Sequence, residues 1–333
     1  MELTKVFIEQ ARKNPLQIVF PESRDERIII AASKIKEQGI ANPVLIGDAE
    51  EVNEIASAQK VSLEGIKIIS PLSDEAVLDK YAELYVQSRN IKTTIAKKLV
   101  KKPLSFGGMM VKAGDADGMV AGVATATASV IQVASLTIGF SEGISTPSSF
   151  FMMVLDKFQD ERDKIFIFAD CAVNIQPDSQ QLAEIGIASG LNAKALLGIE
   201  PKIAFLSFST KGSASHTDVD KVREAVRIAR EQRPDFNIEG EIQADAAIIP
   251  RIAQKKVGES PVAGTANVLI FPDLDAGNIG YKIVQYMANA TALGPILQGF
   301  AKPVNDMSRG ASVDDLIGVT AITVVQAQNL SKK

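Results

Sequence analysis

A hydroxyl, a cation and a glycine stand side by side near the carboxyl end of the sequence, at Ser308, Arg309 and Gly310. An arginine next to a hydroxyl and a small residue can offer paired, charge-assisted hydrogen bonds to an oxyanion while the backbone approaches closely. A carboxylate follows at Asp315, where it could orient the Ser308 hydroxyl for proton transfer. These three side chains are candidates for catalysis on an anionic substrate.

Asp315 also has a purely structural interpretation. The segment from Ser312 to Asp315 fits a capping box, in which Ser312 is the N-cap of a helix and the carboxylate stands at position N3. Aspartate is a poorer capping-box residue than glutamate. The sequence therefore leaves both roles of Asp315 open.

Three further turns are rich in glycine or hydroxyl residues and could hold an anion on backbone N–H groups at the start of a helix. They span residues 118–132, 207–213 and 271–282. Each is a weak signal alone, because hydroxyl residues also cap helices and Lys211 could be a solvated charge. They are secondary candidates for substrate contacts.

Several other kinds of chemistry are disfavoured. Serine–histidine or cysteine–histidine catalysis would need His216, the single histidine, whose polar surroundings indicate a solvated loop residue. The single cysteine, Cys171, follows an apolar run and is interpreted as a packing residue. One His and one Cys cannot build a usual tetrahedral zinc site, and no dinucleotide or P-loop glycine motif is present. The expectation is a metal-independent protein.

The elements that must position these residues alternate between short apolar runs and amphipathic segments, which predicts parallel strands joined by helices and hence an α/β fold. In the first part of the chain, strands are predicted at 17–20, 43–46 and 61–69, and helices at 26–38, 50–59 and, as one or two helices, 74–99. Further on, strands are predicted at 165–168, 203–208 and 268–271, and helices at 179–196 and 219–232. The later strands are apolar on both faces, which is typical of a sheet covered by helices on both sides.

The length of 333 residues predicts two domains, at about 150 residues each. A boundary is expected near 140–147, where glycine, serine, threonine and proline interrupt the pattern. The last helix, expected at 313–330, is too short to be a domain and is expected to pack on the first one. We predict a discontinuous first α/β domain from 1–140 plus 297–333 and a second from 141–296.

Charge and hydropathy limit the partners. Thirty-six Lys and Arg against forty Asp and Glu give a formal net charge of −4, without the basic excess of a nucleic-acid binder. Residues 118–140 carry no charge, but their Ala, Gly, Thr, Ser and Val content is too weakly apolar for a membrane span. Residues 1–14 have an amphipathic pattern and not that of a signal peptide, and a lone cysteine forms no internal disulfide. No nucleic acid and no membrane is expected as a partner, and the expected location is cytoplasmic.

Several longer motifs occur in order along most of the chain, at residues 18–27, 115–118, 206–213, 240–247, 260–267, 271–274, 277–282, 294–299 and 302–310. Together they resemble those of the phosphate acetyltransferase (phosphotransacetylase) family. The resemblance implies reversible transfer of an acetyl group between CoA and phosphate, with no cofactor, no metal and no covalent acyl-enzyme. It also implies two doubly wound α/β domains with an interdomain cleft, as in isocitrate and isopropylmalate dehydrogenases, and a homodimer.

The resemblance also assigns residues. The family's catalytic serine and arginine fall on Ser308 and Arg309, its partner aspartate on Asp315, and an arginine associated with CoA binding on Arg89. Where the family reads His-Ser-Thr-Ala-Asp-x-x-Arg, residues 125–132 read Thr-Ala-Thr-Ala-Ser-Val-Ile-Gln, so a dipole replaces a fixed charge. Contacts with CoA, acetyl phosphate or inorganic phosphate are further expected at Thr127, Gln132, Ser209, Thr210, Lys211, Tyr281 and Lys282.

A mechanism follows from the resemblance. Acyl transfer to CoA needs the thiolate, and a thiol with a pKa of roughly 8.5 is mostly protonated near neutral pH. In this hypothesis Asp315 polarises Ser308, which acts at the CoA sulfur, while Arg309 neutralises the phosphate and the developing oxyanion. The final acceptor of the thiol proton stays open.

Two alternatives remain: a transferase for propionyl or butyryl groups, and a non-catalytic acyl-CoA-binding relative. A dehydrogenase would share the implied architecture but lacks its cofactor motif here.

Overall fold

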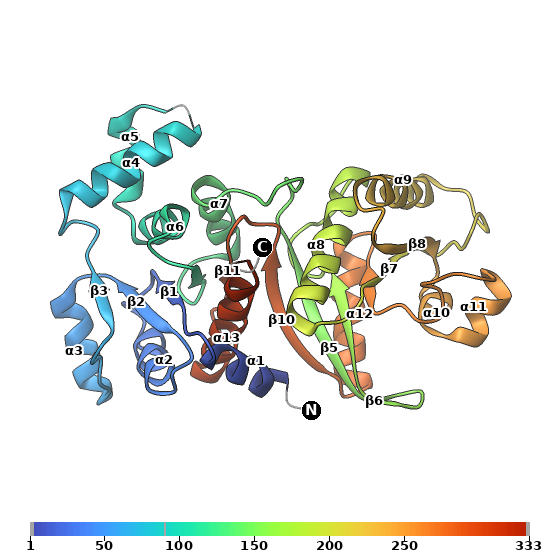
Figure 1. Cartoon of the computed structure of the whole chain (residues 1–333), viewed down its shortest axis with the longest axis horizontal. Helices are drawn as coiled ribbons and strands as arrows, with labels where there is room; N and C mark the ends of the chain where they lie inside the picture. Colours follow the sequence, from blue (N-terminus) through green and yellow to red (C-terminus); the bar gives the residue numbers. More distant parts are fainter. Residues whose placement is uncertain (1–2, 90, 331–333) are drawn as a thin grey trace. The chain divides into compact units, whose positions relative to one another are not determined.

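The computed structural model describes residues 3–89 and 91–330 and divides them into two compact units (Figure 1). Unit 1 comprises residues 142–299, and unit 2 comprises the described residues up to 141 and from 300 onward. Residues 3–141 therefore belong to unit 2, residues 142–299 build unit 1, and the chain returns to unit 2 for the last described strand and helix. These boundaries lie close to the predicted ones after residues 140 and 296.

Unit 2 is built on a parallel sheet whose strand order, among the described residues, is β11-β4-β1-β2-β3. The strands are β1 (Gln17–Phe20), β2 (Asn42–Ile46), β3 (Lys67–Ile69), β4 (Gly118–Ala121) and β11 (Val304–Asp306). The helices are α1 (Leu3–Arg12), α2 (Glu26–Glu37), α3 (Ala49–Gln59), α4 (Glu75–Arg89), α5 (Thr93–Val100), α6 (Pro103–Ala113), α7 (Thr127–Thr137) and α13 (Val313–Leu330). The segment predicted as a strand at 61–69 is a strand only over its last three residues.

Helices cover both faces of the unit 2 sheet. Gly118 of β4 lies against Thr323 of α13, whereas its neighbour Met119 lies against Gly107 of α6. Successive residues of a strand point to opposite faces, so α13 and α6 pack on opposite sides of β4. This two-sided burial explains why β1 is a continuous apolar run with Ile18, Val19 and Phe20 fully buried.

Unit 1 is built on a mixed sheet whose strand order, among the described residues, is β10-β5-β6-β9-β7-β8. The strands are β5 (Ser148–Phe158), β6 (Glu161–Ala169), β7 (Lys202–Leu206), β8 (Asn237–Ile242), β9 (Val268–Ile270) and β10 (Thr291–Gln298). The helices are α8 (Ser179–Leu197), α9 (Thr217–Gln232), α10 (Ala244–Ile248), α11 (Pro250–Lys256) and α12 (Leu274–Met287).

The expectation of parallel strands is wrong for part of unit 1. β10 pairs with β5, and β5 with β6, in antiparallel fashion, and only β6, β9, β7 and β8 run parallel. β5 and β6 are joined by a two-residue turn, Gln159 and Asp160, which is the connection of a hairpin, whereas a parallel pair needs a long crossover.

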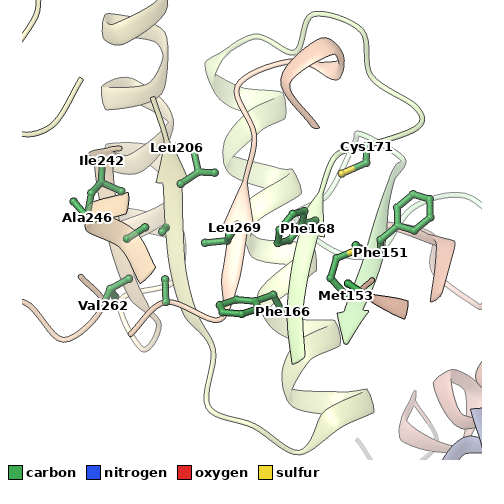
Figure 2. Packing of buried hydrophobic residues seen from close by; sticks show 14 residues of the cluster. Phe151, Met153, Phe166, Phe168, Cys171, Leu206, Ile242, Ala246, Val262 and Leu269 are labelled. Atoms are coloured by element: carbon green, nitrogen blue, oxygen red, sulfur yellow. The ribbon is translucent and has the colours of Figure 1, made fainter. Parts of the chain in front are cut away.

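A buried apolar cluster fills one side of the unit 1 sheet (Figure 2). Phe151, Phe168 and Leu269 project into it from neighbouring strands, and Cys171 lies at its edge. Cys171 is fully buried, and this burial, together with the nearby Asp170 charge, raises the pKa of its thiol well above the ordinary value. The packing interpretation of Cys171 is therefore confirmed.

The uncharged segment at 118–140 forms β4, a loop and α7. Over residues 3–89 and 91–330, no helix is both long and apolar enough to cross a bilayer. Within the same ranges, no group of three or more His, Cys, Asp or Glu side chains is arranged to hold a metal ion.

Candidate active site

The carboxyl ends of three strands lie side by side in the unit 2 sheet, in the order β11, β4, β1. β2 and β3 follow on one side of β1, and β4 and β11 lie on its other side, so the strand order reverses between β1 and β4. In open parallel sheets, ligands bind outside the carboxyl ends of the strands at such a switch point. Ser308 and Arg309 lie on the loop after β11, and Thr127 begins the helix after β4.

Arg27, in the first turn of α2, connects the segments that follow β1, β4 and β11. One terminal nitrogen donates to the carbonyl oxygens of Arg309 (2.8 Å) and Ala311 (3.0 Å), and the other donates to that of Val123 (3.1 Å). Asp25 accepts from Nε at 2.9 Å and from the second terminal nitrogen at 2.8 Å. These hydrogen bonds from Arg27 hold the pKa of Asp25 below its ordinary value. The predicted catalytic loop is thus tied to residues from the two other strand ends.

The Glu22 carboxylate accepts hydrogen bonds from the backbone N–H groups that follow β4. Its carboxylate accepts from the N–H groups of Gly122 at 2.7 Å, Val123 at 3.0 Å and Ala124 at 3.1 Å. Successive backbone N–H groups of this kind form an anion-binding concavity. The anion site that the sequence indicated in this turn is therefore occupied by the chain's own carboxylate.

Ser308 and Arg309 are exposed and have unused hydrogen-bonding groups. Ser308 Oγ accepts from the Gly310 N–H at 3.2 Å, and its own proton has no acceptor among the described residues. In the same part of the chain, the Arg309 guanidinium forms neither a hydrogen bond nor an ion pair. A hydroxyl and an unpaired cation are therefore available next to each other at this strand end.

The Asp315 carboxylate forms its hydrogen bonds with Ser312. Its Oδ2 accepts from the backbone N–H of Ser312 at 2.9 Å and from the Ser312 hydroxyl at 2.8 Å, and the Asp315 N–H donates to that hydroxyl at 3.2 Å. The capping-box interpretation is confirmed. No hydrogen bond joins Asp315 to Ser308 within the described residues, so the action of Asp315 on that hydroxyl stays a prediction.

Asp306 belongs to this site although sequence reasoning did not select it. It ends β11 opposite Ala121 of β4 and is only 5% exposed. Its Oδ2 accepts a hydrogen bond from Thr127 Oγ1 at 2.5 Å, and its Oδ1 is buried with no partner among the described residues. Burial raises the pKa of Asp306 to about 6, an effect that the Thr127 hydrogen bond opposes and the nearby Glu22 charge reinforces. The one signal in the sequence was its place two residues before Ser308.

Three predicted substrate contacts concern α7. Thr127, at its start, joins the site through Asp306, and the exposed side chain of Gln132 forms no hydrogen bond to any described residue. Arg89 of α4 donates from Nε to the carbonyl oxygen of Leu136 at 3.1 Å and also bonds that of Ser135. Arg89 therefore satisfies carbonyls at the carboxyl end of α7, and its CoA contact stays a prediction.

The predicted contacts in the 207–213 turn of unit 1 surround two buried carboxylates. Ser209 Oγ donates to Glu241 at 2.8 Å, and Lys211 Nζ donates to Glu239 at 2.7 Å. The Thr210 hydroxyl accepts at 2.9 Å from the N–H of the residue after β8. These contacts give all three residues a structural role, and their binding of phosphate stays a prediction.

The Glu241 carboxylate accepts hydrogen bonds from both side-chain and backbone donors. It accepts from Arg223 Nε at 2.9 Å, from the Gly212 N–H at 2.8 Å and from Ser209. Although burial opposes ionisation, the hydrogen bonds from Arg223, Gly212 and Ser209 lower the pKa of Glu241 to about 2. This carboxylate is therefore held in its ionised form.

Two predicted contacts lie on α12. The Tyr281 ring stacks on Phe151, with ring centroids 4.2 Å apart, so it belongs to the packing of α12 against the sheet. Lys282 is exposed, and its Nζ lies 5.6 Å from the Tyr281 ring centre. Their contact with substrate also stays a prediction.

Comparisons with known proteins agree with the motifs. The family profile described as "Phosphate acetyl/butaryl transferase" matches residues 2–324. A phosphate acetyltransferase of Thermoanaerobacterium thermosaccharolyticum is 47% identical over 331 residues, which cover 98% of this chain and 100% of that protein. A phosphotransacetylase structure from Streptococcus pyogenes superposes with a TM-score of 0.91 at 42% identity and 98% coverage of both chains.

A more distant structure shares the fold. A 4-hydroxythreonine-4-phosphate dehydrogenase from Burkholderia phymatum superposes with a TM-score of 0.53 at 13% identity, covering 95% of this chain and 98% of its own. At that identity the likeness concerns the fold only, and it confirms the predicted dehydrogenase-like α/β class with two sheets. The matches over nearly the whole length, at 42 to 47% identity, show that the chain belongs to the phosphate acetyl/butyryl transferase family.

Proposed function

We propose that this chain is a phosphate acetyltransferase that moves an acetyl group reversibly between CoA and phosphate, by direct attack with both substrates bound. Its full-length similarity to phosphate acetyltransferases is the observation that carries the proposal. The unpaired guanidinium of Arg309 beside the Ser308 hydroxyl, at the switch point of the unit 2 sheet, fits the same chemistry.

In the thioester-forming direction, the CoA sulfur attacks the acetyl carbon of acetyl phosphate. The sulfur–hydrogen bond of CoA and the carbon–oxygen bond to phosphate break, and a carbon–sulfur bond forms. The phosphate leaves with the electron pair of the carbon–oxygen bond, and the thiol proton is released. Arg309 supplies a fixed positive charge to the phosphate and the developing oxyanion, and Ser308 donates a hydrogen bond to the reacting sulfur. Holding both substrates in one complex supplies the remaining acceleration through orientation.

A thioester absorbance assay with acetyl phosphate and CoA tests the proposal. We expect turnover by the wild type, and we expect Arg309→Ala to lower kcat by about 100- to 1,000-fold because a fixed charge at a developing oxyanion is lost. Arg24→Ala is the matched control, since Arg24 lies on a neighbouring loop, is 82% exposed and, among the described residues, pairs only with Glu51. A wild type that binds CoA without turnover would instead support the non-catalytic alternative.

Acetyl is the proposed acyl group because the full-length relatives quoted above are named as a phosphate acetyltransferase and a phosphotransacetylase. The family description also includes butyryl transfer, and Gln132 stands where the resemblance implies an arginine. Rates measured with acetyl, propionyl and butyryl phosphate separate these substrates. A higher kcat/KM for butyryl than for acetyl phosphate would replace acetyl in the proposal.

We also propose that the protein is a homodimer that associates through α12. The helix presents Ile279, Ile283, Tyr286 and Met287 to the surface, each at least half exposed. Their spacing places them on one face of the helix, opposite the face that carries Tyr281. A continuous apolar face of this kind is suited to a two-fold contact, in which each copy offers the same surface.

Light scattering of the full chain tests the dimer. Ile283→Lys combined with Met287→Lys should convert dimers to monomers, because it buries like charges against each other. Leu72→Lys is the control, since Leu72 is 71% exposed and lies outside α12. A monomeric wild type would refute the dimer.

We propose a cytoplasmic location as well. A single, buried and unpaired cysteine, Cys171, fits a reducing compartment. Activity recovered in the soluble cytoplasmic fraction of a native cell, and not in exported fractions, tests this.

A further inference from the structure

A cavity of about 660 Å³ lies at the β3 edge of the unit 2 sheet, between β3, α4 and α6. Three strand spacings of about 4.8 Å, or about 14 Å, separate β3 from β4. Where the cavity reaches β1 it contacts Gln17, at the opposite end of that strand from the active-site loops. This cavity is therefore separate from the candidate active site, and its volume is that of a small-molecule pocket.

One wall of the cavity is apolar. Val77 and Tyr81 lie four positions apart on α4, so both face the same side of that helix. Phe106 and Met110 lie four positions apart on α6, and the Phe106 ring meets the Tyr81 ring edge-on, with centroids 5.1 Å apart. A flat apolar group can lie against these side chains.

The wall formed by β3 carries unpaired backbone groups. The Ile69 carbonyl accepts from the Gly47 N–H at 3.0 Å, so the backbone groups of Ile69 point toward β2. Those of Ile68, one residue earlier, point to the other edge of the strand. No described strand or turn pairs with that edge. Because Ile68 lines the cavity, a free N–H donor is available to a ligand there.

Four charged side chains line the cavity, and three of them have compensating partners. Lys80 Nζ pairs with Asp115 at 2.8 Å, and the Tyr81 hydroxyl donates to the same carboxylate oxygen at 2.8 Å. These hydrogen bonds, that from Lys80 first, lower the pKa of Asp115. Asp74 accepts from two backbone N–H groups in the first turn of α4, at 2.9 and 3.1 Å.

Lys67 is the fourth charge, and no carboxylate balances it. Its Nζ donates to the side-chain oxygen of Gln17, a neutral group, at 3.0 Å. Within the described residues Lys67 forms no ion pair, and its side chain is exposed. A cation next to a free backbone N–H favours a ligand with anionic oxygen atoms, because both groups can donate to it and the bond from the ammonium is charge-assisted.

We propose that this cavity is a binding site for a small organic carboxylate with a flat apolar body, such as an aromatic acid. The carboxylate accepts hydrogen bonds from Lys67 Nζ and from the Ile68 N–H. The apolar body lies against Val77 and Met110. Because the cavity and the active site lie at different places on the sheet, both can be occupied at once.

Titration calorimetry of the full chain with 2-naphthoate tests the site. We expect the wild type to bind with a Kd on the order of 0.1 to 1 mM, as is usual for a ligand of this size. Lys67→Gln should raise the Kd about 10-fold, because a charge-assisted hydrogen bond is lost. The neutral analogue 2-naphthamide should bind the wild type about 10-fold more weakly than the acid. Val77→Trp should abolish binding, since the indole fills the apolar side of the cavity.

The matched controls are Lys98→Gln and Ile95→Trp on α5. Both residues are exposed and neither lines the cavity, so these variants should keep the wild-type Kd. Arg309→Ala should keep it as well, which separates the cavity from the active site. Circular dichroism establishes that each variant is folded. If Val77→Trp is not, Lys67→Gln decides, since Lys67 is exposed.

The site is refuted if the wild type binds no 2-naphthoate at concentrations up to about 10 mM. A Kd that changes less than threefold in Lys67→Gln, or in a folded Val77→Trp, also overturns it. Equal affinity for 2-naphthamide would contradict recognition of the carboxylate, and loss of binding in Arg309→Ala would place the probe in the active site instead. Because binding is measured without turnover, none of these results depends on the proposed function.

Discussion

Two buried carboxylates, one in each unit, stand on edge strands and behave oppositely. Glu241 on β8 accepts from Arg223, Gly212 and Ser209, and its pKa is lowered to about 2. Asp306 at the end of β11 accepts from one hydroxyl, and its pKa is raised to about 6. Both are about equally buried. The donors around a buried carboxylate, and not its burial alone, therefore decide its charge.

The difference extends to the cations nearby. In unit 1, Lys211 and Arg230 both pair with Glu239, and Arg223 pairs with Glu241. At the strand ends of unit 2, the Arg309 guanidinium has no partner among the described residues. The first arrangement uses its charges for stability, and the second leaves a cation and a weakly held proton site for a ligand.

The largest expected effect concerns the glycine beside each carboxylate. Gly122 has a φ of 110°, and a Cβ there would lie 2.2 Å from Asp306 Oδ1 and 2.6 Å from the Met307 carbonyl oxygen. Gly212 has a φ of 85°, and its nearest atom, on Arg223, would be 3.6 Å away. Gly122→Ala should lower the free energy of unfolding by at least about 3 kcal/mol, and Gly212→Ala by about 1 to 2 kcal/mol.

Urea unfolding followed by far-ultraviolet circular dichroism measures these losses, since the chain has no tryptophan. Hydrogen exchange of amides in β4 and β8 locates each loss in its own unit. Equal losses for the two variants would mean that the loops around Asp306 are not tightly packed.

The next effect is a pair of opposite pH dependences. Because the pKa of Asp306 is raised from 3.8 to about 6, its stabilising contribution is present below pH 3.8 and is lost as the pH rises through 6. Asp306→Asn should therefore match the wild type near pH 4 and be more stable at pH 8, by about 2 kcal/mol.

Glu241 has the reverse sign. Its pKa is lowered from 4.5 to about 2, so its contribution is present above pH 4.5 and is lost as the pH falls toward 2. Glu241→Gln should therefore be less stable than the wild type at pH 6 to 8, by about 2 to 3 kcal/mol, with a smaller difference below pH 4. Unfolding curves at pH 3, 4, 6 and 8 measure both variants. Parallel curves for the two would remove the contrast between the carboxylates.

The smallest effect concerns Lys211. Its side chain is 42% exposed, and Glu239 keeps Arg230 and Ser260 as partners without it. Lys211→Met should lower the free energy of unfolding by about 0.5 kcal/mol. A rise in KM for phosphate in the same variant would support the substrate contact predicted from sequence over the structural role.

The fold class was predictable where the chain obeys local rules. The strand predicted at 17–20 is β1, because an uninterrupted apolar run buried on both faces is typical of a parallel sheet. β5 was missed, and with it the antiparallel part of unit 1. Gln159, in the turn between β5 and β6, has a positive φ of 54°. Glutamine is not one of the residues, such as glycine or asparagine, that mark a hairpin turn in a sequence.

The candidate site was predictable only in part. Ser308 and Arg309 have chemistry that is visible in their types, and the family that the longer motifs indicated is confirmed. Asp306 could not be selected, because its burial depends on the register of β11 against β4 and its partner Thr127 is far away in the chain. The contact of Arg27 with the Arg309 carbonyl likewise joins residues that only the folded sheet brings together.

The discontinuous make-up of unit 2 has a consequence during synthesis. Residues up to 141 leave the ribosome before β11 and α13 are synthesised, so the face of β1 and β4 that α13 covers is still exposed at that stage. The intervening residues 142–299 already contain every described strand of their own sheet when they emerge. The usual order, in which the amino-terminal part folds first, is therefore inverted. Residues 142–299 can fold before the residues up to 141 are joined by the last strand and helix of their own unit.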